Sequence, residues 1–234
     1  MNREYSKYSS QDPSGRKLVD ELPGLVNDIA GYREHMRQIG SHLVRAIEDG
    51  LRSVSSEICV VCTVEDADFL ARGVIERLES IGLGNRIRLL CLWNENIREP
   101  GIRLSPIIKQ YKEDFEGRDP IFIIVKSIVS GACVVKTNLS RALSQANPRR
   151  IYVIAPVIHE GAEKRLENEF PSSISSKFQF VWFACDKEKQ GDLVIPGIGG
   201  SVYELLGFRD SEEKNKYIPT IVKERRKIFS AAPA

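Results

Sequence analysis

The sequence predicts an α/β protein built on a mostly parallel sheet, and two observations support this fold class. Short apolar runs rich in β-branched residues, such as residues 121–125, are typical of strands buried on both faces. These runs alternate along the chain with segments whose apolar residues recur at helical spacing. Such alternation favours parallel strands joined by right-handed crossovers. We expect one main domain, because neither an internal repeat nor a linker interrupts the alternation.

The first 50 residues precede the predicted sheet. Residues 1–20 are rich in Ser, Lys, Tyr and Asp without any period, so we expect a flexible N-terminal arm. Residues 25–51 carry apolar side chains at helical spacing, interrupted by Gly31 and Gly40. That pattern predicts either two helices or one bent helix.

Five buried strands form the predicted sheet, and most of them are followed by a helix. The helix after the first strand can begin at Asp66 or Asp68, whose side chains suit an N-cap, and it ends near Ser80. Helices are also predicted after the third strand, over residues 133–146, and after the fourth, over residues 160–170. The predicted strands span residues 58–64, 86–93, 121–125, 151–157 and 178–184.

Three segments fall outside this alternation. Residues 94–119 contain two prolines and Gly101, so we expect a loop or flap with a short helix. Residues 195–200 (IPGIGG) predict a glycine loop stiffened by proline. Residues 211–234 are charged and are expected to form a C-terminal extension with an exposed helix, which leaves residues 21–210 as the main domain.

Composition and charge exclude several classes of function. The chain is 42% hydrophobic and 28% charged, which is ordinary for a globular domain. Its 34 basic and 32 acidic residues leave a net charge of +2, so no basic field favours nucleic acid as a partner. No apolar run reaches the ~18 residues that a membrane helix needs, and residues 1–16 lack the apolar core of a signal peptide. We therefore expect a cytoplasmic protein without a membrane partner.

The cysteines are expected to be reduced thiols. Cys59 and Cys62 form a CxxC pair, a pattern found in zinc and redox sites. In a strand, however, residues i and i+3 face opposite sides. No second Cys/His pair stands at ligand spacing. We therefore expect no metal ligands and mostly buried thiols at Cys59, Cys62, Cys91, Cys133 and Cys185.

Four stretches are expected to meet at one crevice. Ligands of open parallel sheets bind beyond the carboxyl ends of the strands. Residues 65–68, 93–96, 126–132 and 186–200 follow such ends in the predicted sheet. After the third strand, a small-residue loop and a helix N-terminus would direct backbone N–H groups toward an anion, although an ordinary strand-to-helix turn has the same local sequence.

Several motifs together carry a resemblance to a known family. Residues 32–43 (YREHMRQIGSHL) resemble the first helix of uracil phosphoribosyltransferases, which have the type I phosphoribosyltransferase fold. Residues 194–199 (VIPGIG), followed by residues 205–207 (LLG), resemble the uracil-binding loop of that family. Residues 183–186 (FACD) stand at the expected distance before this loop.

The resemblance covers about residues 25–210 and implies a central parallel sheet flanked by helices. A reduced hood is expected as well, because residues 53–57 are too few to contain the hairpin that the family has near the first strand. It also implies a homodimer. The family transfers ribose 5-phosphate from phosphoribosyl pyrophosphate to uracil, usually with Mg²⁺. Carried over to this chain, the resemblance implies phosphate binding by Lys126, Ser127, Ser130, Gly131 and Ala132, and base binding by Ala184, Asp186, Val194, Ile195, Gly197, Ile198 and Gly199.

The chain departs from the family where the family holds pyrophosphate. Asn94 replaces one arginine, Lys126 replaces the aspartate that binds the ribose, and Gly200 replaces a second aspartate. The loop after the first strand has three carboxylates in place of another arginine, and these would repel pyrophosphate. We therefore expect no catalytic residue, no metal site and no cofactor. The altered pyrophosphate loop consists of Glu65, Asp66, Ala67 and Asp68.

Three functions remain open from the sequence. The first is a degenerate relative that binds a pyrimidine base or nucleotide in a regulatory or sensing role, because the base loop works through backbone groups that survive the substitutions. The second is an active transferase on uracil or another base, which would need phosphoribosyl pyrophosphate and Mg²⁺. The third is a structural or interaction protein, in which the fold supplies a dimer and the segment from Asp210 onward supplies a partner surface.

The exchanged charges at Glu65 and Lys126 suggest a direct contact. Both residues follow strands whose carboxyl ends line the same crevice. Reversing one charge alone would leave like charges together, whereas reversing both restores attraction. We expect an ion pair between Glu65 and Lys126, with Asp66 or Asp68 as a further partner; the alternative is that both side chains turn to water.

Overall fold

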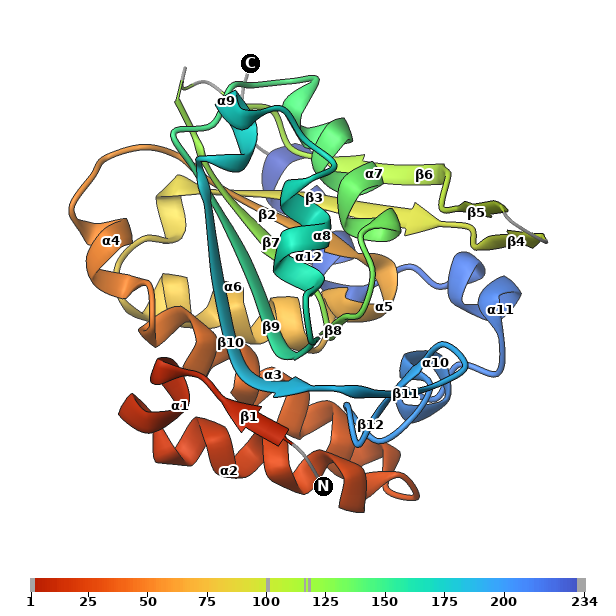
Figure 1. Ribbon diagram of the computed structural model, residues 1–234. Helices are drawn as coiled ribbons and strands as arrows, with labels where there is room; N and C mark the ends of the chain where they lie inside the picture. Colours follow the sequence, from red (N-terminus) through yellow and green to blue (C-terminus); the bar gives the residue numbers. More distant parts are fainter. Residues whose placement is uncertain (1–2, 100–101, 116, 118, 231–234) are drawn as a thin grey trace.

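The protein folds around one central sheet (Figure 1). The computed structural model describes residues 3–99, 102–115, 117 and 119–230. Strands β10, β9, β7, β2 and β3 are parallel to one another, while β1 and β6 lie antiparallel at the two edges and β8 pairs with β9. The strands of this sheet are β1 (Arg3–Tyr5), β2 (Ile58–Thr63), β3 (Ile87–Asn94), β6 (Ile107–Lys112), β7 (Ile121–Val125), β8 (Ile128–Val129), β9 (Arg150–His159) and β10 (Phe178–Asp186).

The predicted α/β class, with a mostly parallel sheet of about five strands flanked by helices, is confirmed. Every residue of β2 and β7 is buried, because helices cover both faces of the sheet. Alternate residues of β2 enter different core clusters, Val60 on one face and Val61 on the other. Cys59 and Cys62 likewise lie in opposite clusters, and all five cysteines are free, as expected.

Two long helices cover one face of the sheet at close quarters. Helices α3 (Ile29–Arg45) and α6 (Leu70–Ser80) pack together there, while α7 (Cys133–Leu143) and α8 (Ala162–Glu167) cover the other face (Figure 1). A Cβ atom on Gly40 would lie 2.1 Å from the carbonyl oxygen of Leu70, and one on Gly73 would lie 1.8 Å from that of Arg37. The two helix backbones can therefore approach this closely only with glycine at both positions.

The predicted helical region over residues 25–51 forms two helices rather than one bent helix. The break falls at residues 46–47, whereas Gly31 and Gly40 both lie inside α3. The remaining short helices are the 3₁₀ helices η1 (Leu22–Leu25) and η2 (Gly84–Arg86) and the α-helices α4 (Glu48–Arg52), α5 (Val64–Ala67), α9 (Ser172–Ser175) and α10 (Val202–Leu205).

The expectation of a flexible N-terminal arm is wrong for the described part of that segment. Strand β1 pairs with β10, and it is followed by α1 (Lys7–Gln11) and α2 (Pro13–Glu21). The side chains of Ser6 and Asp12 cap these two helices. Three elements this short carry too few apolar residues to produce a visible period, which is why the sequence suggested no regular structure.

Residues 94–119 contain strands rather than the expected short helix. Strands β4 (Ile97–Glu99) and β5 (Ile102–Leu104) form a hairpin that projects from the end of the sheet in Figure 1. Strand β6 then returns antiparallel along β3. Pro100 and Gly101 lie outside the described residues.

The C-terminal segment packs against the sheet instead of presenting an exposed helix. It contains α11 (Ser211–Lys216) and α12 (Thr220–Ser230). Ile221 and Val222 belong to the main core, and the buried Arg225 donates two hydrogen bonds to Glu113, at 2.6 and 2.7 Å. Charged side chains alternate here with buried ones, so the composition of the segment did not reveal that part of it is buried.

Candidate functional site

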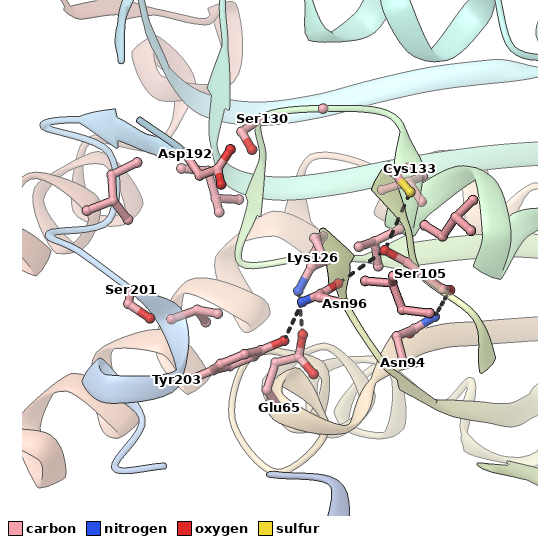
Figure 2. A pocket seen from close by; sticks show the side chains of 18 of the residues that line it. Glu65, Asn94, Asn96, Ser105, Lys126, Ser130, Cys133, Asp192, Ser201 and Tyr203 are labelled. Carbon is pink, nitrogen blue, oxygen red and sulfur yellow. Dashed lines mark hydrogen bonds and ion pairs between the residues drawn. The ribbon is translucent and has the colours of Figure 1, made fainter. Parts of the chain in front are cut away.

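The carboxyl ends of the parallel strands open onto one cavity of about 280 Å³ (Figure 2). Each of the four stretches expected to meet there contributes to its wall, which confirms that prediction. Strand β2 leads to Glu65, β3 to Asn94 and Asn96, and β7 to Lys126. The fourth contribution comes from the hairpin of β11 (Glu188–Gln190) and β12 (Leu193–Ile195) and from the loop after it.

Three further parts of the wall were not anticipated. The β4–β5 hairpin and the residue after it contribute Leu104 and Ser105, and the first turn of α7 contributes Cys133. Tyr203, from α10, also lies in the wall and accepts a hydrogen bond of 2.9 Å from the side chain of Asn96 (Figure 2). The apolar–polar–apolar alternation of residues 102–104 (IRL) was the available signal for strand structure in the hairpin.

Lys126 forms the predicted ion pair with Glu65. Its Nζ atom lies 2.9 Å from Glu65 Oε1, 2.9 Å from Asp66 Oδ2 and 3.2 Å from Thr63 Oγ1. The side chains of Lys126, Glu65 and Asp66 are 11%, 5% and 0% exposed. The expectation is thus confirmed, with Asp66 as the second partner.

The electrostatics of this cluster keep Lys126 and Glu65 ionised. Burial alone would lower the pKa of Lys126, but Asp66 and Glu65 outweigh burial and raise that pKa above its ordinary value. Burial alone would raise the pKa of Glu65, but the cations of Lys126 and Lys214 lower it. Two carboxylates and one ammonium group leave the three-residue cluster with one net negative charge.

Asp68 does not join this cluster but anchors the C-terminal segment. Its carboxylate accepts hydrogen bonds from the Tyr217 hydroxyl and from the backbone N–H groups of Thr220, at 2.6 Å, and Ile221, at 2.8 Å. Burial alone would raise the pKa of Asp68, but these hydrogen bonds and Arg72 lower it. Asp68 therefore ties the end of α5 to α12.

Lys214 is a buried residue of the site that sequence reasoning missed. Its side chain is fully buried, and Nζ donates a 2.5 Å hydrogen bond to the carbonyl oxygen of Asn94. The same Nζ lies 5.1 Å from the ring centroid of Tyr203. Lys214 thus contacts two residues of the cavity wall from behind. It lies in a segment that composition had marked as a solvated extension, so no local signal distinguished it.

The predicted phosphate-binding segment is only partly at the cavity. Lys126, Ser130 and Gly131 line the wall, whereas Ser127 and Ala132 do not. Ser127 is fully buried and its hydroxyl donates to Asp66. Residues 128–129 form β8 and pair with β9, so part of the backbone expected to cradle an anion is used inside the sheet.

The predicted base-binding segment is held by contacts within the protein. The fully buried Asp186 receives hydrogen bonds from Arg3 Nε at 2.9 Å, from Arg3 Nη2 at 2.8 Å and from the N–H group of Gly197 at 2.9 Å. Arg3 also donates to the Gly197 carbonyl oxygen at 2.7 Å, and the Tyr32 hydroxyl donates to that of Ile198 at 3.1 Å. None of the seven predicted residues lines the cavity, namely Ala184, Asp186, Val194, Ile195, Gly197, Ile198 and Gly199.

Two side-chain oxygens in the wall residues lack a hydrogen-bond donor. Glu65 Oε2 and Asn94 Oδ1 are both buried and have no partner among the described residues. The other ends of these side chains are committed: Glu65 Oε1 binds Lys126, and Asn94 Nδ2 donates to the Ser105 carbonyl oxygen at 3.0 Å and to Asn138 Oδ1 at 2.9 Å. Unpaired buried acceptors are rare in native proteins, and both oxygens are covered by the protein, with less than 1 Å² of accessible surface each.

Other features bear on metals and membranes. Within the described ranges, no group of three or more His, Cys, Asp or Glu side chains is arranged to hold a metal ion. No helix in the part of the chain that the structure describes combines the length and apolar character needed to cross a membrane.

Comparisons with known proteins found similarity to solved structures but to no other class of known protein. No family model and no curated protein matches the chain. The adenine phosphoribosyltransferase of Giardia lamblia in complex with 9-deazaadenine is 9% identical, with a TM-score of 0.42 over 71% of this chain and 84% of that one. The hypoxanthine-guanine phosphoribosyltransferase of Leishmania donovani is 11% identical (TM-score 0.41; 62% and 75%), and the protein TT1426 of Thermus thermophilus is 12% identical (0.46; 78% and 95%). Because every one of these TM-scores is below 0.5, we base no functional assignment on the similarities.

Proposed function

We propose that this protein binds a pyrimidine base, free or as part of a nucleotide, in the cavity at the carboxyl ends of the strands, and that it does not transfer ribose phosphate. Binding without turnover suits a regulatory or sensing role. The observation that carries the proposal is the ion cluster of Lys126, Glu65 and Asp66. It lies where the family that the sequence resembles would hold phosphoribosyl pyrophosphate.

The charge of this cluster opposes a pyrophosphate. A transferase must stabilise the leaving pyrophosphate with cations or N–H donors. Here the ammonium group of Lys126 is already bound by two carboxylates, and the cluster as a whole is negative. Catalysis would require Lys126 to leave both buried carboxylates without the cation that they share, which costs several kcal/mol, about 3–5 for a typical buried pair.

The rest of the wall is better suited to a base than to a phosphate. It combines the amide side chains of Asn94 and Asn96 and the aromatic ring of Tyr203 with apolar side chains such as Leu104. A small cavity with apolar walls and a few polar groups is typical of sites for small organic ligands. The volume of about 280 Å³ is in keeping with a ligand of one ring, with or without a sugar.

Thermal shift and isothermal titration with uracil, UMP and phosphoribosyl pyrophosphate test the proposal. A response to the base or to UMP, without a response to phosphoribosyl pyrophosphate and without formation of UMP from the two substrates, supports it. Turnover approaching the ~10 per second of ordinary enzymes would instead support an active transferase. The absence of any response would favour a structural or interaction protein.

A further inference from the structure

A second cavity, of about 200 Å³, lies between α1, the end of α3 and β10. Helix α1 packs against β10 in this region (Figure 1). The second cavity shares no wall residue with the cavity at the carboxyl ends of the strands. A ligand bound here would therefore be independent of Lys126 and Glu65, and of the proposed function.

The apolar part of the second cavity suits an aromatic ring. Phe183, which is 1% exposed, lines it together with Tyr8 and Ala46, both of which pack against the main core. The Tyr8 hydroxyl accepts a hydrogen bond of 3.4 Å from Gln179 Nε2, which holds its ring in place. Aromatic side chains pack favourably against a further ring in offset or edge-to-face arrangements. The cavity volume of about 200 Å³ leaves room for one ring with a small substituent.

The carboxylate in this wall is already engaged by the protein. Asp12 Oδ1 accepts from the Gly15 N–H group at 3.0 Å, and Asp12 Oδ2 lies 2.6 Å from His42 Nδ1. At that distance the ring nitrogen must carry a hydrogen and donate it. Burial alone would raise the pKa of Asp12, but His42, the Gly15 N–H group and Arg45 lower it. Asp12 therefore stays ionised, with both oxygens in use.

The guanidinium group of Arg45 is less well satisfied. Its Nη1 atom lies 3.8 Å from Asp12 Oδ2, beyond hydrogen-bonding distance, and no other carboxylate of the described residues forms an ion pair with it. The contact of 3.3 Å with His42 Nδ1 is not a hydrogen bond, because that nitrogen donates to Asp12. A guanidinium group carries five N–H donors. At 49% exposure, those of Arg45 are left to water, which a ligand can displace.

We propose that the second cavity binds a small aromatic carboxylate, with the ring against Tyr8 and Phe183 and the carboxylate on the guanidinium group of Arg45. Guanidinium and carboxylate groups match in geometry, and two parallel N–H···O bonds can join them. A neutral ring would keep the packing but lose this charge-assisted contact. A cationic ring would be repelled by Arg45 and would find Asp12 already engaged.

Isothermal titration with benzoate and benzamide tests the role of charge, because the two probes share a ring and nearly the same shape. We expect benzoate to bind the wild-type protein at least about five-fold more tightly than benzamide, since hydrogen bonds between charged groups are the stronger ones. Arg45→Gln should remove this preference. Arg52→Gln should keep it and is a matched control, because Arg52 is also 49% exposed but pairs with Glu48 outside the second cavity.

Backbone amide chemical shifts, measured by NMR during the benzoate titration, test the location. The largest changes should fall at residues 8–12 and 42–46. Changes centred on Lys126, equal affinities for the two probes, a preference that survives Arg45→Gln, or no saturable benzoate binding up to about 10 mM would each overturn the inference. Binding of uracil or UMP is measured separately and should be unaffected by Arg45→Gln, so the proposed function can fail or hold on its own.

Discussion

Lys126 and Glu65 form a buried ion pair between the end of β7 and α5, the short helix after β2, with 2.9 Å between Nζ and Oε1. Asp66 binds the same ammonium group at 2.9 Å. A buried charge is tolerated only when it is paired, and removing one partner leaves the other uncompensated. This cluster therefore links the integrity of the fold to the charge of the cavity.

Replacing Lys126 by Met should destabilise the protein strongly. The substitution leaves Glu65 and Asp66 close together without the cation that they share, and we expect a loss of about 3–5 kcal/mol in the free energy of unfolding. Urea unfolding monitored by circular dichroism measures this loss. Lys136→Met is the matched control, because its partner Glu169 and Lys136 itself are 38% and 49% exposed. The control should cost only about 0–1 kcal/mol, and equal losses in the two variants would contradict the role of the buried cluster.

The carboxylate of Asp68 should make stability depend on acid pH. Its pKa in the folded protein lies below the usual value of 3.8, so its stabilising contribution is complete above that value and is lost as the pH falls through the lower folded-state pKa. In Asp68→Asn, one carboxylate oxygen becomes an N–H group that cannot accept from the C-terminal segment. We expect a loss of about 1.5–3 kcal/mol at neutral pH.

The pH profile separates this role from a general loss of packing. Unfolding free energies of the wild-type protein and Asp68→Asn, measured from neutral pH down to about pH 2, should converge as the pH falls, because protonation removes in the wild type what the variant already lacks. A constant difference between the two proteins over the whole range would show that the charge of Asp68 is not responsible.

The central strands and the shared crevice could be predicted because their signals are local. The buried run that became β7 was predicted at its observed bounds, and the pairing of Lys126 with Glu65 followed from the rule that parallel strands end at one edge of a sheet. The first inference needed only the residue types of the run, and the second also used the exchange of charges relative to the family that the sequence resembles.

The parts of the site that were missed depend on contacts between distant segments. Arg3 and Asp186 are 183 positions apart, and Lys214 reaches Asn94 across 120 positions. Neither contact has a periodic signature, since a single long side chain supplies the interaction. The predicted base loop illustrates the same limit, because its motif is present but Arg3 and Tyr32 occupy the carbonyl oxygens of Gly197 and Ile198.

The homodimer expected from the sequence should involve the β6 edge of the sheet. Leu104 and Ile108 are 54% and 50% exposed, and β6 has no neighbour on its outer side among the described strands. Exposed apolar residues beside an open strand edge are typical of an association surface. Light scattering at micromolar concentration should give twice the mass of the chain, and Ile108→Lys should give a monomer. Ile228→Lys, at a residue 64% exposed on α12, should leave the dimer intact.

Arg3 should contribute to stability although it lies near the start of the chain. Its guanidinium group donates two hydrogen bonds to Asp186, whose side chain is 0% exposed, and one to the Gly197 carbonyl oxygen. Arg3→Met would leave the buried carboxylate with the N–H group of Gly197 as a hydrogen-bond donor but without its cation, and we expect a loss of about 3–5 kcal/mol.

A matched control for Arg3→Met is Arg37→Met, which removes another two-bond contact with a carboxylate. Arg37 donates to Glu76 at 2.7 and 2.9 Å, but the two side chains are 46% and 37% exposed. Exposed pairs contribute about 0–1 kcal/mol, so urea unfolding should rank Arg3→Met far below Arg37→Met in stability. If the two variants unfold alike, β1 is not anchored by Arg3, and the segment would behave as the flexible arm that its composition suggests.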